Sequence, residues 1–235
     1  MAVYACSDLH GCYRLYEKII NILKPGDRVI FLGDAADRGP DNLKTIRAIK
    51  NNPDWMYLKG NHEDMMVQAF RKGSLTSFYN GGTMTYREID NAKDKEELLE
   101  YLDNLPYLFY YKGENGNKYW LCHAGFTYRG GNPFEYCSNY DLVWSRTHFM
   151  DSFDDDIIIV HGHTPIEYLG DGSFDTQDGH WMGEAFHSPY LYANNHKIDI
   201  DAGSFYTHET YLLNLDTFEY TLIKEEGDEL QEWNA

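Results

Sequence analysis

Five short apolar runs along the chain are rich in β-branched and aromatic residues and predict buried strands. They cover residues 3–6, 29–32, 55–58, 119–122 and 157–160. Between them, residues 13–24 and 41–50 place apolar side chains such as Leu15, Ile19 and Ile46 at helical spacing on one face. Alternating strands and helices imply crossover connections and a largely parallel or mixed sheet with helices on its faces, which is the α/β class.

The middle of the chain, residues 63–104, has a mainly helical pattern that is interrupted at Gly81-Gly82. We interpret it as a helical cap inserted into a single domain spanning residues 1–235, because a chain of this length with 43% hydrophobic residues can bury one sizeable core. The other segments predict four further strands, of which the last two form a hairpin. They also predict a long loop and a solvated acidic tail. The strands are at 107–111, 197–200, 210–215 and 218–223, the loop at 170–190 and the tail at 225–235.

The negative net charge limits the kinds of molecule that the protein can bind. Twenty Lys and Arg residues against 38 Asp and Glu residues give a formal charge of −18, which repels nucleic acid at long range. The sequence has no apolar run of membrane-spanning length and no secretory pattern at its N-terminus, so we expect a cytoplasmic protein with neither nucleic acid nor membrane as a partner. An anionic substrate would need a local concentration of positive charge, and bound metal ions can supply it.

The cysteines predict neither a disulfide framework nor a zinc site. Cys6, Cys12, Cys122 and Cys137 show no C-x-x-C spacing, and Cys6 and Cys122 fall inside apolar runs. We therefore expect free thiols that belong to the core.

Each of the five apolar runs is followed closely by side chains that can bind a metal. In chain order they are Asp8 with His10, Asp34, Asn61, His123, and His161 with His163. Ligands of open α/β folds collect outside the carboxyl ends of the strands, so we expect these side chains to converge there. A lone His or Asp at one strand end would be read as an ordinary loop residue, but five such placements in one chain favour a shared site.

The ligand types indicate which metals could bind. Imidazole nitrogens combined with carboxylate and amide oxygens suit Mn, Fe, Zn, Ni or Co better than Ca or Mg alone. Two metals held close together require a bridging carboxylate, and a solvent oxygen beside them becomes a hydroxide near neutral pH. Asp34 is the candidate bridge.

The metal-binding residues lie in ordered blocks that resemble the phosphoprotein phosphatase family of calcineurin-like metallophosphoesterases. The blocks are Ser7-Asp8-Leu9-His10-Gly11, Gly33-Asp34-Ala35-Ala36-Asp37-Arg38-Gly39, Gly60-Asn61-His62-Glu63, His123-Ala124-Gly125 and His161-Gly162-His163-Thr164. The pattern is most similar to the small bacterial and phage lambda-type Ser/Thr phosphatases, and it extends from Asp8 to about Gly203. The resemblance implies an α+β four-layer sandwich with central mixed β-sheets flanked by helices.

The resemblance also implies a division of the ligands between two divalent metal ions, with manganese favoured. One metal would be held by Asp8, His10 and Asp34, and the other by Asp34, Asn61, His123 and His163. His161 is set aside, because the family's ligand is the His that precedes the Thr, here Thr164.

The remaining roles that the resemblance implies are catalytic. His62 would be the general acid, steered by Asp37, and Arg38 and Arg146 would bind the phosphate, with Arg146 resting on the shorter match Trp144-Ser145-Arg146. These types suit the chemistry, because the Arg fork fits phosphate oxygens in pairs and His is the usual proton donor near neutral pH. A surface ion pair for Arg38 and a helix-start role for His62 are the ordinary alternatives.

We therefore expect a metal-dependent phosphomonoester hydrolase in which a bridging hydroxide attacks phosphorus in line. The expected substrate is a phosphorylated protein or peptide, with specificity for phospho-Ser and phospho-Thr or for phospho-Tyr as well. A dinucleoside-polyphosphate hydrolase is the alternative, since it shares the metal blocks. A catalytically silent phosphoprotein-binding scaffold is a third interpretation, and the intact ligand set argues against it.

Five histidines lie outside the metal blocks, and we expect them to be ordinary surface or loop residues. They are His148, His180, His187, His196 and His208.

Overall fold

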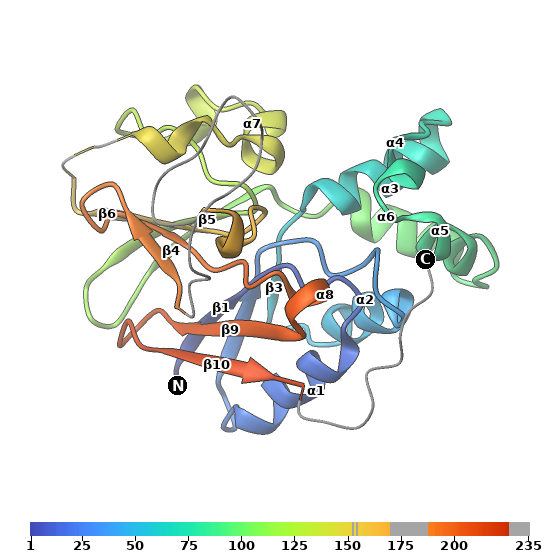
Figure 1. Cartoon of the computed structure of the whole chain (residues 1–235), viewed down its shortest axis with the longest axis horizontal. Coiled ribbons are helices and arrows are strands. Elements are labelled where there is room, and N and C mark those ends of the chain that lie inside the picture. The colour runs from blue at the N-terminus through green and yellow to red at the C-terminus, as the bar shows by residue number, and fades with distance from the viewer. Residues whose placement is uncertain (152, 154, 170–187, 226–235) are drawn as a thin grey trace.

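Two five-stranded mixed sheets form the centre of the protein in the computed structural model, which describes residues 1–151, 153, 155–169 and 188–225 (Figure 1). The first sheet, called sheet A here, has the order β10-β9-β1-β2-β3. In it β1, β2 and β3 run parallel, while β9 pairs antiparallel with β1 and β10 antiparallel with β9. Its strands are β1 (Val3–Cys6), β2 (Arg28–Phe31), β3 (Met56–Tyr57), β9 (Glu209–Asn214) and β10 (Tyr220–Lys224).

The second sheet, called sheet B here, has the order β4-β5-β6-β8-β7. Its three central strands β5, β6 and β8 run parallel, and the two edge strands β4 and β7 are antiparallel to their neighbours. The strands are β4 (Leu108–Lys112), β5 (Lys118–Cys122), β6 (Ile157–His161), β7 (Tyr190–Tyr192) and β8 (Lys197–Asp199). The predicted mixed sheets and the predicted hairpin β9–β10 are thus confirmed.

The helices form two groups and several short separate segments (Figure 1). Helices α1 (Tyr13–Ile22) and α2 (Asn42–Lys50) connect the parallel strands of sheet A, as the apolar spacing predicts. The stretch predicted as a helical cap contains α3 (Asn61–Lys72), α4 (Thr76–Tyr79), α5 (Thr83–Asp90) and α6 (Lys95–Asp103), with the Gly81-Gly82 break between α4 and α5. The remaining short helices are η1 (Pro133–Glu135), α7 (Asn139–Trp144), η2 (Thr147–Met150), η3 (Ile166–Tyr168) and α8 (Ser204–Thr207).

Strand β2 shows how the layers are built. Val29 and Phe31 pack into a core shared with α1, α2 and the cap helices, whereas Ile30 and Leu32 belong to a second core that lies between the sheets. Side chains alternate between the two faces of a strand, so a fully apolar run serves both cores. A third core lies on the far side of sheet B, where Leu142 of α7 joins it. Helices, sheet A, sheet B and the α7 region therefore form the four layers expected.

Three further expectations concern the chain as a whole. Within the described residues no helix is both long enough and apolar enough to cross a membrane. All four cysteines are free, and Cys6, Cys12 and Cys122 are buried as predicted, while Cys137 is half-buried. Residues 170–187 of the predicted loop and 226–235 of the predicted tail lie outside the described residues.

The inter-sheet core gives a stability prediction. Ile198 of β8 is 1% exposed between the sheets, so Ile198→Ala should lower the free energy of unfolding by about 2–5 kcal/mol through lost burial and a residual cavity. Its register partner Leu191 on β7 is 42% exposed, and Leu191→Ala should change stability by no more than about 0.5 kcal/mol. Urea unfolding of both variants measures the difference, and equal losses would contradict this position of the core.

Candidate metal centre

The candidate ligands from the two sheets meet at one place, as their positions after the strands predict. Two groups of buried side chains bring their ligand atoms within 4.8 Å of one another in the described residues. The first contains His10, Asp34 and His62, and the second contains Asp34, His123 and His163. Asp34 is common to both groups.

The Asp34 carboxylate is surrounded by imidazoles. Its Oδ2 lies 3.3 Å from His123 Nε2 and 3.8 Å from the Nε2 atoms of both His10 and His62, and its Oδ1 accepts the His62 backbone N–H at 3.0 Å. Burial alone would raise the pKa of Asp34, but the charges of His123, His62 and His10 outweigh it and hold the pKa well below the usual value. The carboxylate is therefore ionised at the centre of the site.

Two histidines are oriented by backbone carbonyls. His10 Nδ1 donates to the Ala36 carbonyl and His123 Nδ1 to the Leu32 carbonyl, both at 2.9 Å, so the Nε2 atom of each ring points into the site. Such hydrogen bonds fix the tautomer and ring orientation of metal-binding histidines. His123 Nε2 lies 2.8 Å from Asn61 Oδ1 and 3.1 Å from His163 Nδ1, so three candidate ligands converge on one point.

Two observations fit a positive ion at this place. His163 is only 7% exposed, and its Nε2 atom is buried without a hydrogen-bond partner. Burial lowers the pKa of His123, but Asp34 and Asp8 outweigh that effect and raise it to about 9. The carboxylates of Asp34 and Asp8 therefore favour a positive charge at the His123 imidazole, where a metal ion would compete with a proton. The mixed nitrogen and oxygen donor set suits borderline divalent metals.

The backbone of the site is held in an unusual conformation. Positive φ angles, which cost energy for residues other than Gly, occur at six predicted site residues, namely Asp8, His10, Asp34, Asp37, Arg38 and His163. Bonds between the loops hold these residues in place: the His10 N–H donates to the Asp34 carbonyl at 2.9 Å, and the His163 N–H donates to Asp8 Oδ2 at 3.0 Å. The fold thus retains strained loops where the side chains must converge.

Two glycines allow the carboxylates to lie against the neighbouring backbone. A Cβ on Gly60 would lie 2.1 Å from Asp34 Oδ1, and one on Gly162 would lie 2.2 Å from Asp8 Oδ2. No side chain fits at either position without moving the carboxylate. The Asp8 carboxylate, which also accepts from Ser7 Oγ, lies beside the two groups but belongs to neither.

The candidate acid and one candidate phosphate-binding residue lie on the side of the first group. His62 Nδ1 is 2.7 Å from Asp37 Oδ2, and both side chains are buried. Arg38 is exposed, and its two terminal nitrogens lie 2.8 Å from His10 Nε2 and 3.1 Å from His62 Nε2. Burial lowers the pKa of His62, but Asp34 and Asp37 outweigh it, so the pKa is raised above its usual value.

The second candidate phosphate-binding residue lies on the side of the other group. Arg146 follows α7 by two residues, is exposed, and donates from Nη2 to the His163 carbonyl at 3.5 Å. Trp144 at the end of the same helix packs edge-to-face with His163 at a ring-centroid distance of 5.8 Å. A Ser138 capping box fixes the start of α7, so the helix places both residues.

The two histidines of the last block lie in different surroundings. His161 lies outside both groups, with Nε2 2.6 Å from the Tyr192 hydroxyl, whereas His163 points into the second group. The expectation for His148 is wrong, because this side chain is fully buried and contacts the Tyr192 hydroxyl at 2.8 Å and the Ala124 carbonyl at 2.6 Å. It fits there because Gly125 has no Cβ, which would lie 2.6 Å from the His148 ring.

His180 and His187 lie outside the described residues, and His196 and His208 are half-buried. Two buried carboxyl groups beside the site did not stand out in the sequence, namely Asp199 and Asp201. Burial, with mutual repulsion added for Asp199, raises the pKa of both well above the usual value. The short Asp-Ile-Asp pattern around β8 was the available signal, but nothing in it distinguishes buried acids from a solvated strand end.

Several known proteins are similar to this chain. Serine/threonine-protein phosphatase 2 of Escherichia coli (strain K12) is 27% identical over 210 residues, which cover 86% of this chain and 87% of that protein. The symmetrical bis(5'-nucleosyl)-tetraphosphatase of Dechloromonas aromatica (strain RCB) is 34% identical over 129 residues, which cover 53% of this chain and 44% of that protein. The match thus spans less than half the length of the tetraphosphatase.

Among solved structures, a candidate diadenosine tetraphosphatase superposes with a TM-score of 0.67 at 16% identity, covering 96% of this chain and 94% of that chain. At this identity the likeness supports the fold alone. A family model described as calcineurin-like phosphoesterase matches residues 1–209, which include every candidate ligand. The chain therefore belongs to the calcineurin-like phosphoesterase family and is a metal-dependent phosphoester hydrolase.

Proposed function

We propose that this phosphoesterase removes phosphate from phosphoserine and phosphothreonine in proteins or peptides, with phosphotyrosine as a further substrate. The observation that carries the choice of substrate is coverage: the likeness to the E. coli serine/threonine-protein phosphatase 2 extends over 87% of that protein, against 44% for the tetraphosphatase. An aligned region that includes the cap supports a common substrate class better than shared metal blocks do, because specificity lies in the parts around a site.

We assign two metal sites to the converging side chains. Asp8, His10 and Asp34 would hold one metal, and Asp34, Asn61, His123 and His163 the other. The place of Asp34 in both buried groups supports its role as the bridge. Manganese is the favoured ion, and the same donors accept iron, zinc, nickel or cobalt. Bound metals would activate water and neutralise charge on the phosphate.

The protein's own groups would bind and protonate the substrate. Arg38 and Arg146, one beside each buried group, would bind the phosphate oxygens and orient the ester for in-line displacement. His62 belongs by distance to the first group, but Asp37 engages its Nδ1, so we assign it to proton donation. Asp37 would favour the imidazolium that protonates the leaving oxygen.

The acid assignment can be tested with leaving groups of different basicity. His62→Asn should lower kcat on a phosphoserine peptide by about two to four orders of magnitude, the usual contribution of general acid catalysis, while bound metal stays unchanged. The loss should be smaller on p-nitrophenyl phosphate, because nitrophenolate leaves without a proton. His208→Asn is the matched control, since His208 lies 3.5 Å from Glu225 and belongs to neither buried group. Wild-type turnover by His62→Asn on the peptide would contradict the assignment.

The bridge assignment predicts a loss of metal-dependent stability. An ion present at a free concentration of 100 times its dissociation constant stabilises the protein that binds it by about 2.7 kcal/mol. The unfolding temperature of the wild type should therefore rise when Mn²⁺ is added. Asp34→Asn keeps the shape but loses the charge, and it should remove most of this shift. Asp54→Asn, at an exposed position, should keep it. An undiminished shift in Asp34→Asn would mean that Asp34 is not a ligand.

The tetraphosphatase function is the second candidate, favoured by the 34% identity over the shared region. The two functions separate in one assay: phosphate release from phosphoserine and phosphothreonine peptides is compared with hydrolysis of diadenosine tetraphosphate, with Mn, Ni, Zn and Mg supplied separately. We expect the peptides to be hydrolysed. Activity confined to the dinucleotide would overturn the protein substrate.

A further inference from the structure

Glu63 is only 2% exposed, and its carboxylate accepts four hydrogen bonds from the protein. Its Oε2 accepts the backbone N–H groups of Asp34 at 2.8 Å and Gly60 at 2.9 Å. Its Oε1 accepts the backbone N–H of Ala35 at 3.1 Å and the hydroxyl of Tyr57 at 2.6 Å. A buried carboxylate with this many donors is strongly fixed, because hydrogen bonds to a charged acceptor are about twice as strong as neutral ones.

These bonds join two of the three loops of sheet A that carry candidate ligands. One loop contains Asp34, whose φ of 53° is an unfavourable conformation for a residue with a side chain. The other ends at Gly60, which precedes Asn61 directly and starts α3. Holding the N–H groups of Asp34 and Gly60 on one oxygen sets the distance between the loops. Glu63 therefore acts on the position of the proposed bridge without touching the substrate side of the site.

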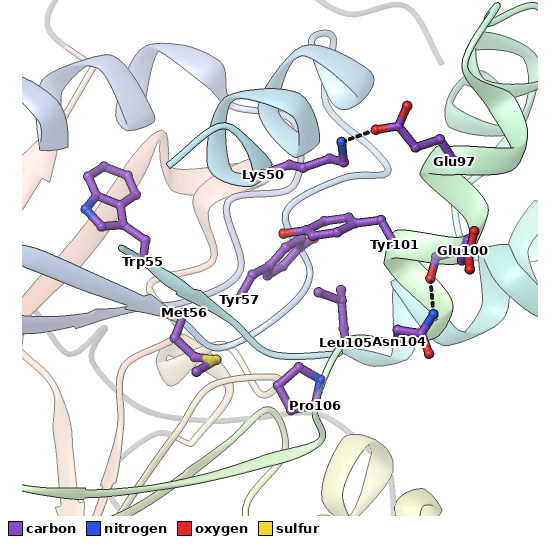
Figure 2. A pocket seen from close by; sticks show the side chains of 10 residues that line it. All are labelled: Lys50, Trp55, Met56, Tyr57, Glu97, Glu100, Tyr101, Asn104, Leu105 and Pro106. Carbon is purple, nitrogen blue, oxygen red and sulfur yellow. Dashed lines mark hydrogen bonds and ion pairs between the residues drawn. The ribbon is translucent and has the colours of Figure 1, made fainter. Parts of the chain in front are cut away.

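Tyr57, which donates to Glu63, is also one of the residues that line a surface pocket. The pocket has a volume of about 440 Å³ and lies between β3 and α6, with Tyr57, Tyr101 and Leu105 among its lining residues (Figure 2). The Tyr57 and Tyr101 rings lie side by side with centroids 6.3 Å apart, yet of these two tyrosines Tyr57 is the one that donates a hydrogen bond to Glu63. Two tyrosines that line one pocket thus differ in whether they bond to Glu63.

We propose that Tyr57 and Glu63 are positioning residues that set the metal affinity of the site. The inference rests on the proposed ligand roles of Asp34 and Asn61. Removing the phenol oxygen leaves Oε1 with one donor, so the carboxylate can rotate and the strained turn at Asp34 and Ala35 loosens. Outer partners of metal ligands commonly contribute about 10- to 100-fold to metal affinity. The ligands themselves stay in place, so saturating metal restores their geometry.

Calorimetric titration of the metal-free full-length chain with Mn²⁺ tests the proposal. Tyr57→Phe should weaken Mn²⁺ binding by about 10-fold, and Glu63→Gln, whose amide places a donor against another donor, by about 10- to 100-fold. Tyr101→Phe is the matched control and should bind within about twofold of the wild type, because it changes the same pocket without removing a bond to Glu63. Tyr57→Phe decides the question if Glu63→Gln fails to fold.

A second readout separates positioning from general packing. The Mn²⁺ concentration that gives half-maximal p-nitrophenyl phosphate turnover should rise about 10-fold in Tyr57→Phe, while kcat at saturating Mn²⁺ returns to within about twofold of the wild type. Unchanged Mn²⁺ affinity in Tyr57→Phe, or equal weakening in Tyr57→Phe and Tyr101→Phe, would overturn the proposal. A wild type inactive on phosphopeptides would contradict the proposed substrate only, because the order of the Mn²⁺ affinities is measured without it.

Discussion

The burial of one carboxylate, Asp34, is the constraint on which the site depends. A carboxylate at 2% exposure costs several kcal/mol unless charges and hydrogen bonds offset its lost hydration. Here three imidazole rings lie within 3.8 Å of Oδ2, and the His62 backbone N–H donates to Oδ1. The backbone N–H of Asp34 itself donates to Glu63, which fixes the main chain. Three features surround this cluster of charges: the ends of the parallel strands of both sheets, the glycines that leave room for the carboxylates, and the turns with positive φ.

The sequence predicts those parts of the fold that follow from local periodicity. Strand β1 is confirmed residue for residue, and β2, β5 and β6 are each within one residue at both ends, because their runs are apolar on both faces and are bounded by polar or glycine-rich loops. One rule places Asp34 beside Asp8 and Asn61 at one edge of sheet A, and His123 beside His163 at one edge of sheet B, since parallel strands present their carboxyl ends at the same edge. Local pattern and simple topology are sufficient for this much. The meeting of these two edges depends on how the sheets stack.

Contacts between distant segments are not contained in a local pattern. His148 carries no periodic signal, and its burial depends on a missing Cβ at Gly125, 23 residues away in the chain. The bond from Tyr57 to Glu63 likewise requires the exact start of α3, which lies two residues before the predicted cap. The cap also contacts the site directly, because the Arg38 N–H donates to the Gly81 carbonyl at 3.2 Å. Such pairings depend on three-dimensional shape, which the sequence pattern does not specify.

The candidate ligands come from both sheets: Asp8, His10, Asp34 and Asn61 follow strands of sheet A, while His123 and His163 follow strands of sheet B. Two metal ions held by these ligands would therefore cross-link the two sheets, in addition to forming a reaction centre. In mechanical terms, sliding one sheet over the other would break coordination bonds as well as apolar contacts. Resistance to shear and catalytic competence would in this way be properties of the same few atoms.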